Sequence, residues 1–280
     1  VMDSIRGSID LITKILPSEK KCDKNRYREF WSLHSALIFY HYDAAVLLMH
    51  SLLSALTGHY SVAFSELRSA MESLVRGVVF DLLAVPRYRK EATELQKIEG
   101  FKRAAGFPEL LKVLEEQLGD GRPSMSIEIF DIIDRELRGF NPEASFTRLL
   151  RQLNKWKIID AELFQEADAY YAELSRHAHR VHPRFSEVGL RIATQRDWIE
   201  LEPVPEELFA YLHSFIDLNG LFTYLVLRAF SADLALKACR GCIDWDALKG
   251  GIERASKLAR KYKTWRRTRD LLEELRSLTQ

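Results

Sequence analysis

The chain has 280 residues, of which 47% are hydrophobic and 29% charged, and its formal net charge is +1. This composition is ordinary for a globular protein with a large core, and the charge excludes a surface that coats nucleic acid uniformly. We find no apolar run of the roughly eighteen residues that span a bilayer, because His50 interrupts 44–56, and no signal-peptide pattern. We therefore expect a cytoplasmic protein with no membrane partner. Plentiful charge with scarce Asn and Gln is typical of thermophile proteins.

The first third of the chain reads as helices. A short amphipathic helix is predicted over residues 3–16, and a long helical region from about 26 to 57 ends at Gly58, which closes it as a C-terminal cap would. The strongest helical pattern covers 60–83, with an apolar face that starts at Phe64.

Arg68 and Glu72 flank that apolar face, four residues apart. They form either a solvated ion-pair ladder or a polar seam that orients a site on a neighbouring helix. The sequence leaves both interpretations open, because the two residues border the apolar face and do not oppose it.

The middle of the chain, 87–155, is predicted to be a helical insertion between two core hairpins. Proline and glycine clusters divide it into short helices at about 87–99, 108–118, 124–138 and 143–153.

The stretch Tyr170–Pro183 concentrates chemistry, with three histidines, two arginines and a serine. Asp160 is placed to cap the start of its helix, and Pro183 to end that helix near His182. One face of the helix then carries Ser175, His179 and His182.

Arg176-His177-x4-His182 resembles the R-[N/H/D]-x4–6-H signature of the HEPN superfamily. The resemblance implies helical domains that often form homodimers, many of them metal-independent ribonucleases. It implies that His182 exchanges a proton with the ribose 2′-OH or the leaving oxygen, that Arg176 stabilises the phosphorane charge, and that His177 belongs to the same catalytic set. Arg28-x5-His34 also fits the loose pattern.

A second set of motifs supports the fold. Gly58-x-Tyr60-x2-Ala63-x3-Leu67-Arg68-x3-Glu72, followed by Leu174-Ser175-x3-His179, is similar to a group of prokaryotic helical proteins that we regard as HEPN-like. The similarity covers about 43–185. It implies that Arg68, Glu72, Ser175 and His179 shape a shared binding cleft.

The last third adds a second functional lead. Alternating apolar residues predict a short hairpin at 187–202, Pro205 opens a long helix to about 238, and Asp244 caps a final helical pair.

The segment Lys257–Arg269 holds seven basic residues in thirteen, with aromatic residues between them. It is either a surface that binds RNA or a solvated helix face whose tryptophan packs inward. The binding residues of the first interpretation are Lys261, Trp265, Arg266 and Arg267.

No metal or cofactor site is expected. Cys239 and Cys242 form a CxxC without a second ligand pair, so packing or an incidental disulfide is favoured over an intermolecular metal site or a redox role. His177 points away from His179 and His182 on a helix, which disfavours a histidine metal site.

We thus predict an all-α, multi-helical, HEPN-like bundle over 1–243 and a basic C-terminal helical extension over 244–280. The leading functional hypothesis is a metal-independent endoribonuclease of a defence or toxin system, acting on RNA as a homodimer. The alternative is a non-enzymatic helical module that binds nucleotide, nucleic acid or a protein, and a third is a scaffold without phosphate affinity.

Overall fold

The computed structural model describes residues 1–15, 25, 34–83, 85–92, 146–178, 205–232 and 243–279. Within these ranges the chain forms nine helices and no strand, which confirms the predicted all-α, multi-helical fold. The helices are α1 (Met2–Ile15), α3 (Ser35–Leu56), α4 (Tyr60–Leu83), α5 (Pro86–Lys90), α9 (Phe146–Lys155), α10 (Ala161–Ala178), α12 (Pro205–Ala232), α14 (Trp245–Leu258) and α15 (Lys263–Thr279). The predicted hairpin at 187–202 lies outside the described residues.

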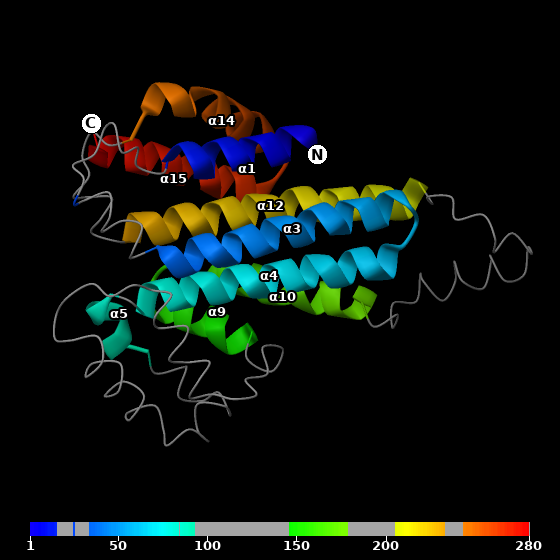
Figure 1. Ribbon diagram of the computed structural model, residues 1–280, viewed down its shortest axis with the longest axis horizontal. Helices are drawn as coiled ribbons and strands as arrows, with labels where there is room; N and C mark the ends of the chain where they lie inside the picture. Colours follow the sequence, from blue (N-terminus) through cyan, green and yellow to red (C-terminus); the bar gives the residue numbers. More distant parts are fainter. Residues whose placement is uncertain are drawn as a thin grey trace, which may run out of the picture.

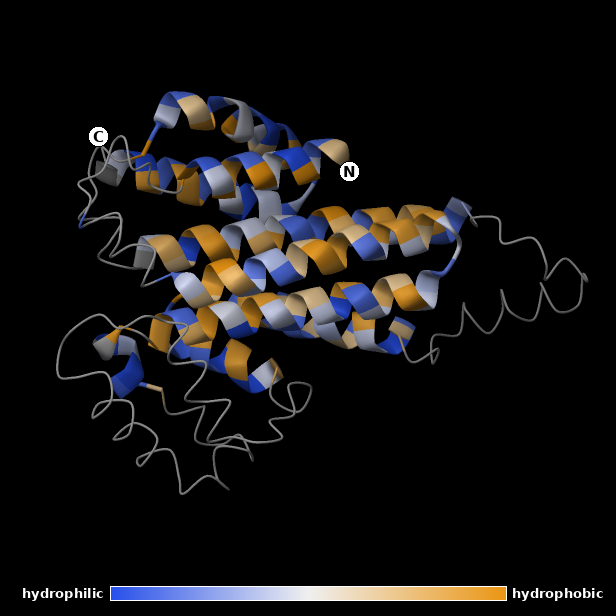
Figure 2. Ribbon diagram, in the orientation of Figure 1, coloured by the Kyte–Doolittle hydropathy of each residue, from blue (hydrophilic) through white to orange (hydrophobic). Residues whose placement is uncertain are grey.

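The long helices α3, α4, α10 and α12 run side by side along the longest axis of the molecule (Figure 1). Helices α1, α14 and α15 form a layer on the α12 side, while α5 and α9 lie on the opposite side, below α4 and α10. The outer helices α1 and α14 alternate apolar and polar residues along their length (Figure 2). Helix α4 contacts α3, α10, α12 and α9, so it is the centre of the bundle.

The boundaries of α3 and α4 follow from local signals. Helix α4 spans the residues that the apolar pattern predicted, and its inward face is buried from Phe64 to Leu83. Gly58 ends α3 with a φ of 78°, a left-handed conformation that favours glycine. The Gly58 amide donates to the Ala55 carbonyl (3.1 Å) and the His59 amide to the Ser54 carbonyl (2.8 Å), which is the Schellman arrangement.

Three predicted helix starts are confirmed. Asp160 Oδ1 accepts a hydrogen bond from the Leu163 amide at 2.7 Å, and Asp244 Oδ1 accepts one from the Ala247 amide at 3.1 Å. These carboxylates satisfy amides that have no partner inside the helix. Pro205 is the first residue of α12.

Of the helical region predicted over about 26–57, α3 covers Ser35–Leu56 and follows the turn residue His34, and 26–33 lie outside the described residues. The helix predicted over 87–99 ends at Lys90, where the Gln152 side chain on α9 donates to the Glu91 carbonyl at 3.0 Å and replaces a helical partner. The final helical pair predicted after Asp244 is confirmed, with a turn between α14 and α15 that lets each helix pack on a different neighbour.

Helix α3 is long and apolar enough to cross a membrane by length and composition, so the sequence-based exclusion of such a helix is wrong by that criterion. Core helices of globular proteins and signal sequences meet the same criterion; a core helix is mostly buried, whereas only 33% of the most apolar window of α3 is buried in this fold. Apolar residues recur along α3 in Figure 2.

Candidate functional site

Arg68 and Glu72 lie in a polar seam between α4 and α10. Their side chains are only 10% and 11% exposed, and Arg68 Nε lies 3.5 Å from Glu72 Oε1. The Tyr171 hydroxyl on α10 donates to the same Glu72 oxygen at 2.5 Å. Burial excludes the solvated ladder, and the partner of the pair on α10 is a tyrosine that the motifs did not single out.

His177 also faces this interface. It is 8% exposed, its ring stacks on Phe64 with centroids 4.1 Å apart, and Nε2 lies 3.1 Å from Glu173 Oε1. The residue continues the inward stripe of α10 through Ala167 and Leu174. The packing of this ring between α4 and α10 gives His177 a structural role, and its assignment to the catalytic set stays a prediction.

Arg176, the next residue back along the chain, is on the outside. Its side chain is 60% exposed, and Nη2 pairs with Glu173 Oε2 at 2.5 Å, one helical turn earlier. Ser175 is half-buried. His179 and His182 lie outside the described residues, so the predicted pairing of Arg176 with His182 stays a prediction.

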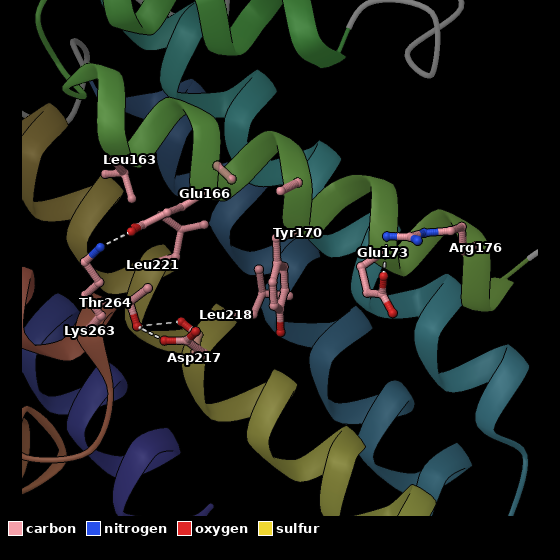
Figure 3. Close-up of a pocket in the computed structure, with 12 residues that line it drawn as sticks. Leu163, Glu166, Tyr170, Glu173, Arg176, Asp217, Leu218, Leu221, Lys263 and Thr264 are labelled. Carbon is pink, nitrogen blue, oxygen red and sulfur yellow. Dashed lines mark hydrogen bonds and ion pairs between the residues drawn. The ribbon is translucent and has the colours of Figure 1, made fainter. Parts of the chain in front are cut away.

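A groove of about 490 Å³ runs between α10, α12 and α15 and includes Arg176 at one end (Figure 3). Its floor is apolar, formed by Leu163, Ala167, Tyr170, Leu218 and Leu221. The Tyr170 hydroxyl donates to the Ser214 carbonyl at 2.5 Å. Burial of this phenol raises its pKa, so Tyr170 remains protonated and serves as a fixed part of the wall.

Both ends of the groove are occupied by ion pairs. Lys263 on α15 contacts Glu166 and, at 2.6 Å, Glu162 of α10, while Arg176 contacts Glu173 at the other end. The hydrogen bond to Glu162, followed by the one to Glu166, raises the pKa of Lys263. Each cation in the groove wall is thus already paired with a carboxylate of α10.

Asp217 is the remaining charged residue of the wall. Its Oδ1 accepts a hydrogen bond from the Thr264 hydroxyl at 2.6 Å, and the same hydroxyl lies 2.9 Å from the Asp217 carbonyl. Among the described residues no cation pairs with this carboxylate. The groove therefore combines an apolar floor with one uncompensated negative charge (Figure 3).

Two of the four residues predicted to bind RNA in 257–269 are engaged in contacts within the fold. Trp265 is fully buried, and its indole Nε1 donates to the Ile216 carbonyl at 2.9 Å, so its assignment as a base-stacking residue is wrong. Arg267 pairs with Asp160 Oδ2 at 2.6 Å and with Glu162 Oε2 at 2.7 Å. Only Lys261 and Arg266 of the four predicted binding residues are exposed and without an ion pair in the described part of the chain.

These pairs also set the pKa values around the start of α10. Partial burial opposes the shift, but the Leu163 amide and the Arg267 guanidinium together hold the pKa of Asp160 below its ordinary value. The Lys263 ammonium, and secondly Arg267, lowers the pKa of Glu162. Two of the seven basic residues, Lys263 and Arg267, are thus paired with acidic residues at the start of α10.

His34, the histidine of the alternative motif, is likewise closed to substrate. It is 1% exposed, its Nδ1 lies 2.5 Å from Asp81 Oδ2, and its ring meets Phe230 edge-on at 4.8 Å. The pair joins the start of α3 to the end of α4, which is a structural role. Among the described residues no group of three His, Cys, Asp or Glu side chains could hold a metal ion.

Comparison of the chain with models of protein families, with curated proteins and with solved structures found no match in any of the three. The resemblance to HEPN domains thus rests on the sequence motifs alone. The groove residues Tyr170, Asp217 and Lys263 were not predicted, although an acidic residue inside the apolar pattern of 205–238 is a signal that could have drawn attention to Asp217.

Proposed function

We propose that the protein is a non-enzymatic helical module whose groove between α10, α12 and α15 binds a small amphipathic molecule with an apolar body and a positively charged amine. The observation that carries the proposal is the Asp217 carboxylate, which borders an apolar floor and has no cationic partner among the described residues. An amine of the ligand would supply that partner.

The size and lining of the groove support a small ligand. Its volume of about 490 Å³ falls within the range of sites that enclose small organic molecules. Such sites are mostly apolar and use a few polar groups to fix orientation, and Thr264 holds the Asp217 carboxylate in place for that purpose.

The charge of the groove disfavours a phosphate-bearing ligand. Glu166, Glu173 and Asp217 outnumber Arg176 and Lys263, so the wall has a net negative charge when all five are ionised. A polyanion would meet repulsion there. This argument favours the binding module and weighs against nucleotide or nucleic acid as the occupant of the groove.

Calorimetric titration with a pair of matched probes tests the proposal. Tryptamine has an apolar indole and an amine, whereas indole-3-propionate has the same ring and a carboxylate. We expect saturable binding of tryptamine alone, weakened roughly tenfold in Asp217→Asn, which removes the charge but keeps an acceptor for the Thr264 hydroxyl. Asp246→Asn on α14 is the matched control and should bind like the wild type. Equal binding of both probes, or no loss in Asp217→Asn, would contradict the proposed ligand.

A metal-independent endoribonuclease is the second candidate, and the exposure of Arg176 at the end of the groove favours it. The proposal includes RNA as substrate, a homodimer and a cytoplasmic location. Labelled RNA of mixed sequence, incubated with EDTA-treated protein, should be cleaved by the wild type and by Arg6→Ala, which alters an exposed arginine on α1. Arg176→Ala and His182→Ala should not cleave it while keeping their helical circular dichroism. Intact RNA with the wild type would eliminate this candidate.

A further inference from the structure

Helix α3 exposes a continuous apolar seam that no described part of the chain covers. Six of the ten exposed large hydrophobic side chains of the described residues lie on this helix, with exposures between 38% and 73%. They are Phe39, Tyr42, Val46, Met49, Leu53 and Leu56. The opposite face of α3, which includes Ala44, Leu48 and Ala55, is buried.

The spacing of the seam is that of a helix–helix contact. The six residues recur at intervals of three, four, three, four and three, which is the a/d pattern of a heptad repeat. A stripe with this period lets two helices pack lengthwise at a small crossing angle, about 20°. Scattered surface hydrophobics have no such period.

We propose that α3 forms the interface of a homodimer in which the two copies of the helix pack antiparallel about a two-fold axis near Leu47 and Leu48. The proposal does not depend on the ligand of the groove, and it supplies an interface for the homodimer that the ribonuclease candidate also includes. It names the surface and the geometry of the contact, and it follows from the exposure and register of the α3 side chains.

The spacing of the six seam residues is the same in both directions along α3. If α3 packs antiparallel against a second copy, with the two-fold axis between residues 47 and 48, the six seam residues form three different pairs between the copies. Symmetry repeats each pair once. The pairs are Phe39 with Leu56 of the second copy, Tyr42 with Leu53, and Val46 with Met49. Each pair then combines one residue from the first half of the seam with one from the second, so both aromatic side chains face aliphatic ones. A parallel pair would instead place aromatic rings against each other at one end.

Charge complementarity selects the same orientation. Asp43 and His50 are exposed, and both follow a d position of the seam, which makes them e residues of the heptads. One carboxylate oxygen of Asp43 accepts a hydrogen bond from the Ser73 hydroxyl of α4 at 2.5 Å. In an antiparallel pair, e residues face e residues of the partner helix, so Asp43 would lie beside His50 of the second copy on each side of the axis. In a parallel pair, e residues face g positions, which here are occupied by Ile38, Ala45 and Leu52.

The seam is also large enough for a stable contact. With the observed exposures, its six side chains present roughly 700 Å² per protomer, close to the about 800 Å² that each partner contributes to a standard interface. The same face makes a lipid bilayer a poor occupant, because Asp43 and His50 would have to enter hydrocarbon beside the apolar residues.

Sedimentation of the full chain tests the interface. The wild type should sediment as two 32.5 kDa chains, and the double variant Val46→Glu, Met49→Glu, which places four carboxylates around the axis, should be monomeric with unchanged helical circular dichroism. The control Ile9→Glu alters an equally exposed side chain on α1 and should remain dimeric. A monomeric wild type, a wild type that instead pellets with phosphatidylcholine vesicles, or a dimer unaffected by the double variant would overturn the proposal.

Disulfide trapping distinguishes the two orientations. In a background with Cys22, Cys239 and Cys242 changed to serine, chains with Phe39→Cys and chains with Leu56→Cys are oxidised separately and as a mixture. The antiparallel pair predicts cross-linking in the mixture alone, because two copies of position 39 lie about 26 Å apart, the rise of 17 helical residues. Cross-linking of Phe39→Cys with itself would overturn the antiparallel arrangement.

The charge pairs give a third, milder perturbation. His50→Glu would place a carboxylate beside Asp43 of the other copy and should weaken dimerisation roughly tenfold. His50→Lys keeps a cation there and should leave the dimer at least as stable. Equal dissociation constants for the two variants would contradict the pairing of Asp43 with His50.

Discussion

Replacing Gly77 with alanine should destabilise the protein, because the close contact of α3 and α4 leaves no room for a methyl group. A Cβ at this position would lie 2.6 Å from Tyr40 Cβ and 3.2 Å from Tyr40 Cγ. Since the Cβ of Tyr40 is fixed to the backbone, no rotation of its side chain relieves the overlap. Relief requires α3 to move away from α4, and that would loosen the contact of Tyr40 with Phe80, whose ring lies 6.0 Å away.

Two opposing terms set the size of the effect. Alanine is a better helix former than glycine by about 1 kcal/mol. Overpacking a well-packed core costs about 1–3 kcal/mol, and an overlap with a backbone-linked carbon belongs in the upper part of that range. We therefore expect the free energy of unfolding to fall by about 1–2 kcal/mol.

Urea unfolding followed by circular dichroism measures this difference at fixed protein concentration. Gly250→Ala on α14 is the matched control, because a Cβ there meets only the flexible guanidinium of Arg254 at 3.4 Å. The control should raise the free energy of unfolding by about 0.5–1 kcal/mol through helix propensity alone. If Gly77→Ala is as stable as Gly250→Ala, the inferred closeness of α3 and α4 is wrong.

Three further predictions concern buried polar groups. Burial lowers the pKa of His41 to about 4 from 6.5, so between these pH values the unfolded chain binds a proton that the folded chain does not. The free energy of unfolding should therefore fall by at most about 2 kcal/mol from pH 7 to pH 5. Urea titrations of His41→Gln should show a smaller dependence on pH over this range. Trp265→Phe should lower the free energy of unfolding by about 1–3 kcal/mol in the same assay, because it removes the hydrogen bond to the Ile216 carbonyl and part of the buried ring. An unchanged unfolding midpoint would refute the packing role of Trp265. A double-mutant cycle of Tyr171→Phe with Glu72→Gln should give a coupling of about 1 kcal/mol, whereas a coupling near zero would show that the bond in the α4–α10 seam does not contribute.

Features encoded by neighbouring residues were predictable from the sequence. Helix α4 could be delimited because its apolar period is unbroken between Gly58 and Leu83, and Asp160, Asp244 and Pro205 mark helix starts through interactions with the next few residues. The length of α5 was not predictable in this way. Its end depends on the Gln152 side chain, which is 61 residues away from the carbonyl that it binds.

The candidate site is formed by contacts between residues far apart in the chain, which the pattern of neighbouring residues does not reveal. Arg176 and His177 are adjacent in the motif, yet a rotation of about 100° along the helix places one in solvent and the other against Phe64. The sequence left Trp265 open as a base-stacking aromatic residue or as an inward-packed one. The contact that decides for the second is made by α12, since a Cβ at Gly220 would lie 2.7 Å from the indole. Asp217 became a candidate only once α10 and α15 were seen to supply the rest of its groove.

The layer formed by α1, α14 and α15 has a consequence for the synthesis of the protein. Asp10 on α1 pairs with Arg254 on α14, and Ser4 Oγ accepts a hydrogen bond from Asn219 on α12 across 215 residues of chain. Arg254 is translated 244 residues after Asp10 (254 − 10), a delay of roughly 10–50 s at typical elongation rates. During that interval the apolar face of α1, which includes Leu11 and Ile15, has no α14 to cover it. A chain whose synthesis pauses before α14 would therefore expose an amphipathic helix whose main neighbour in the fold has not yet been made.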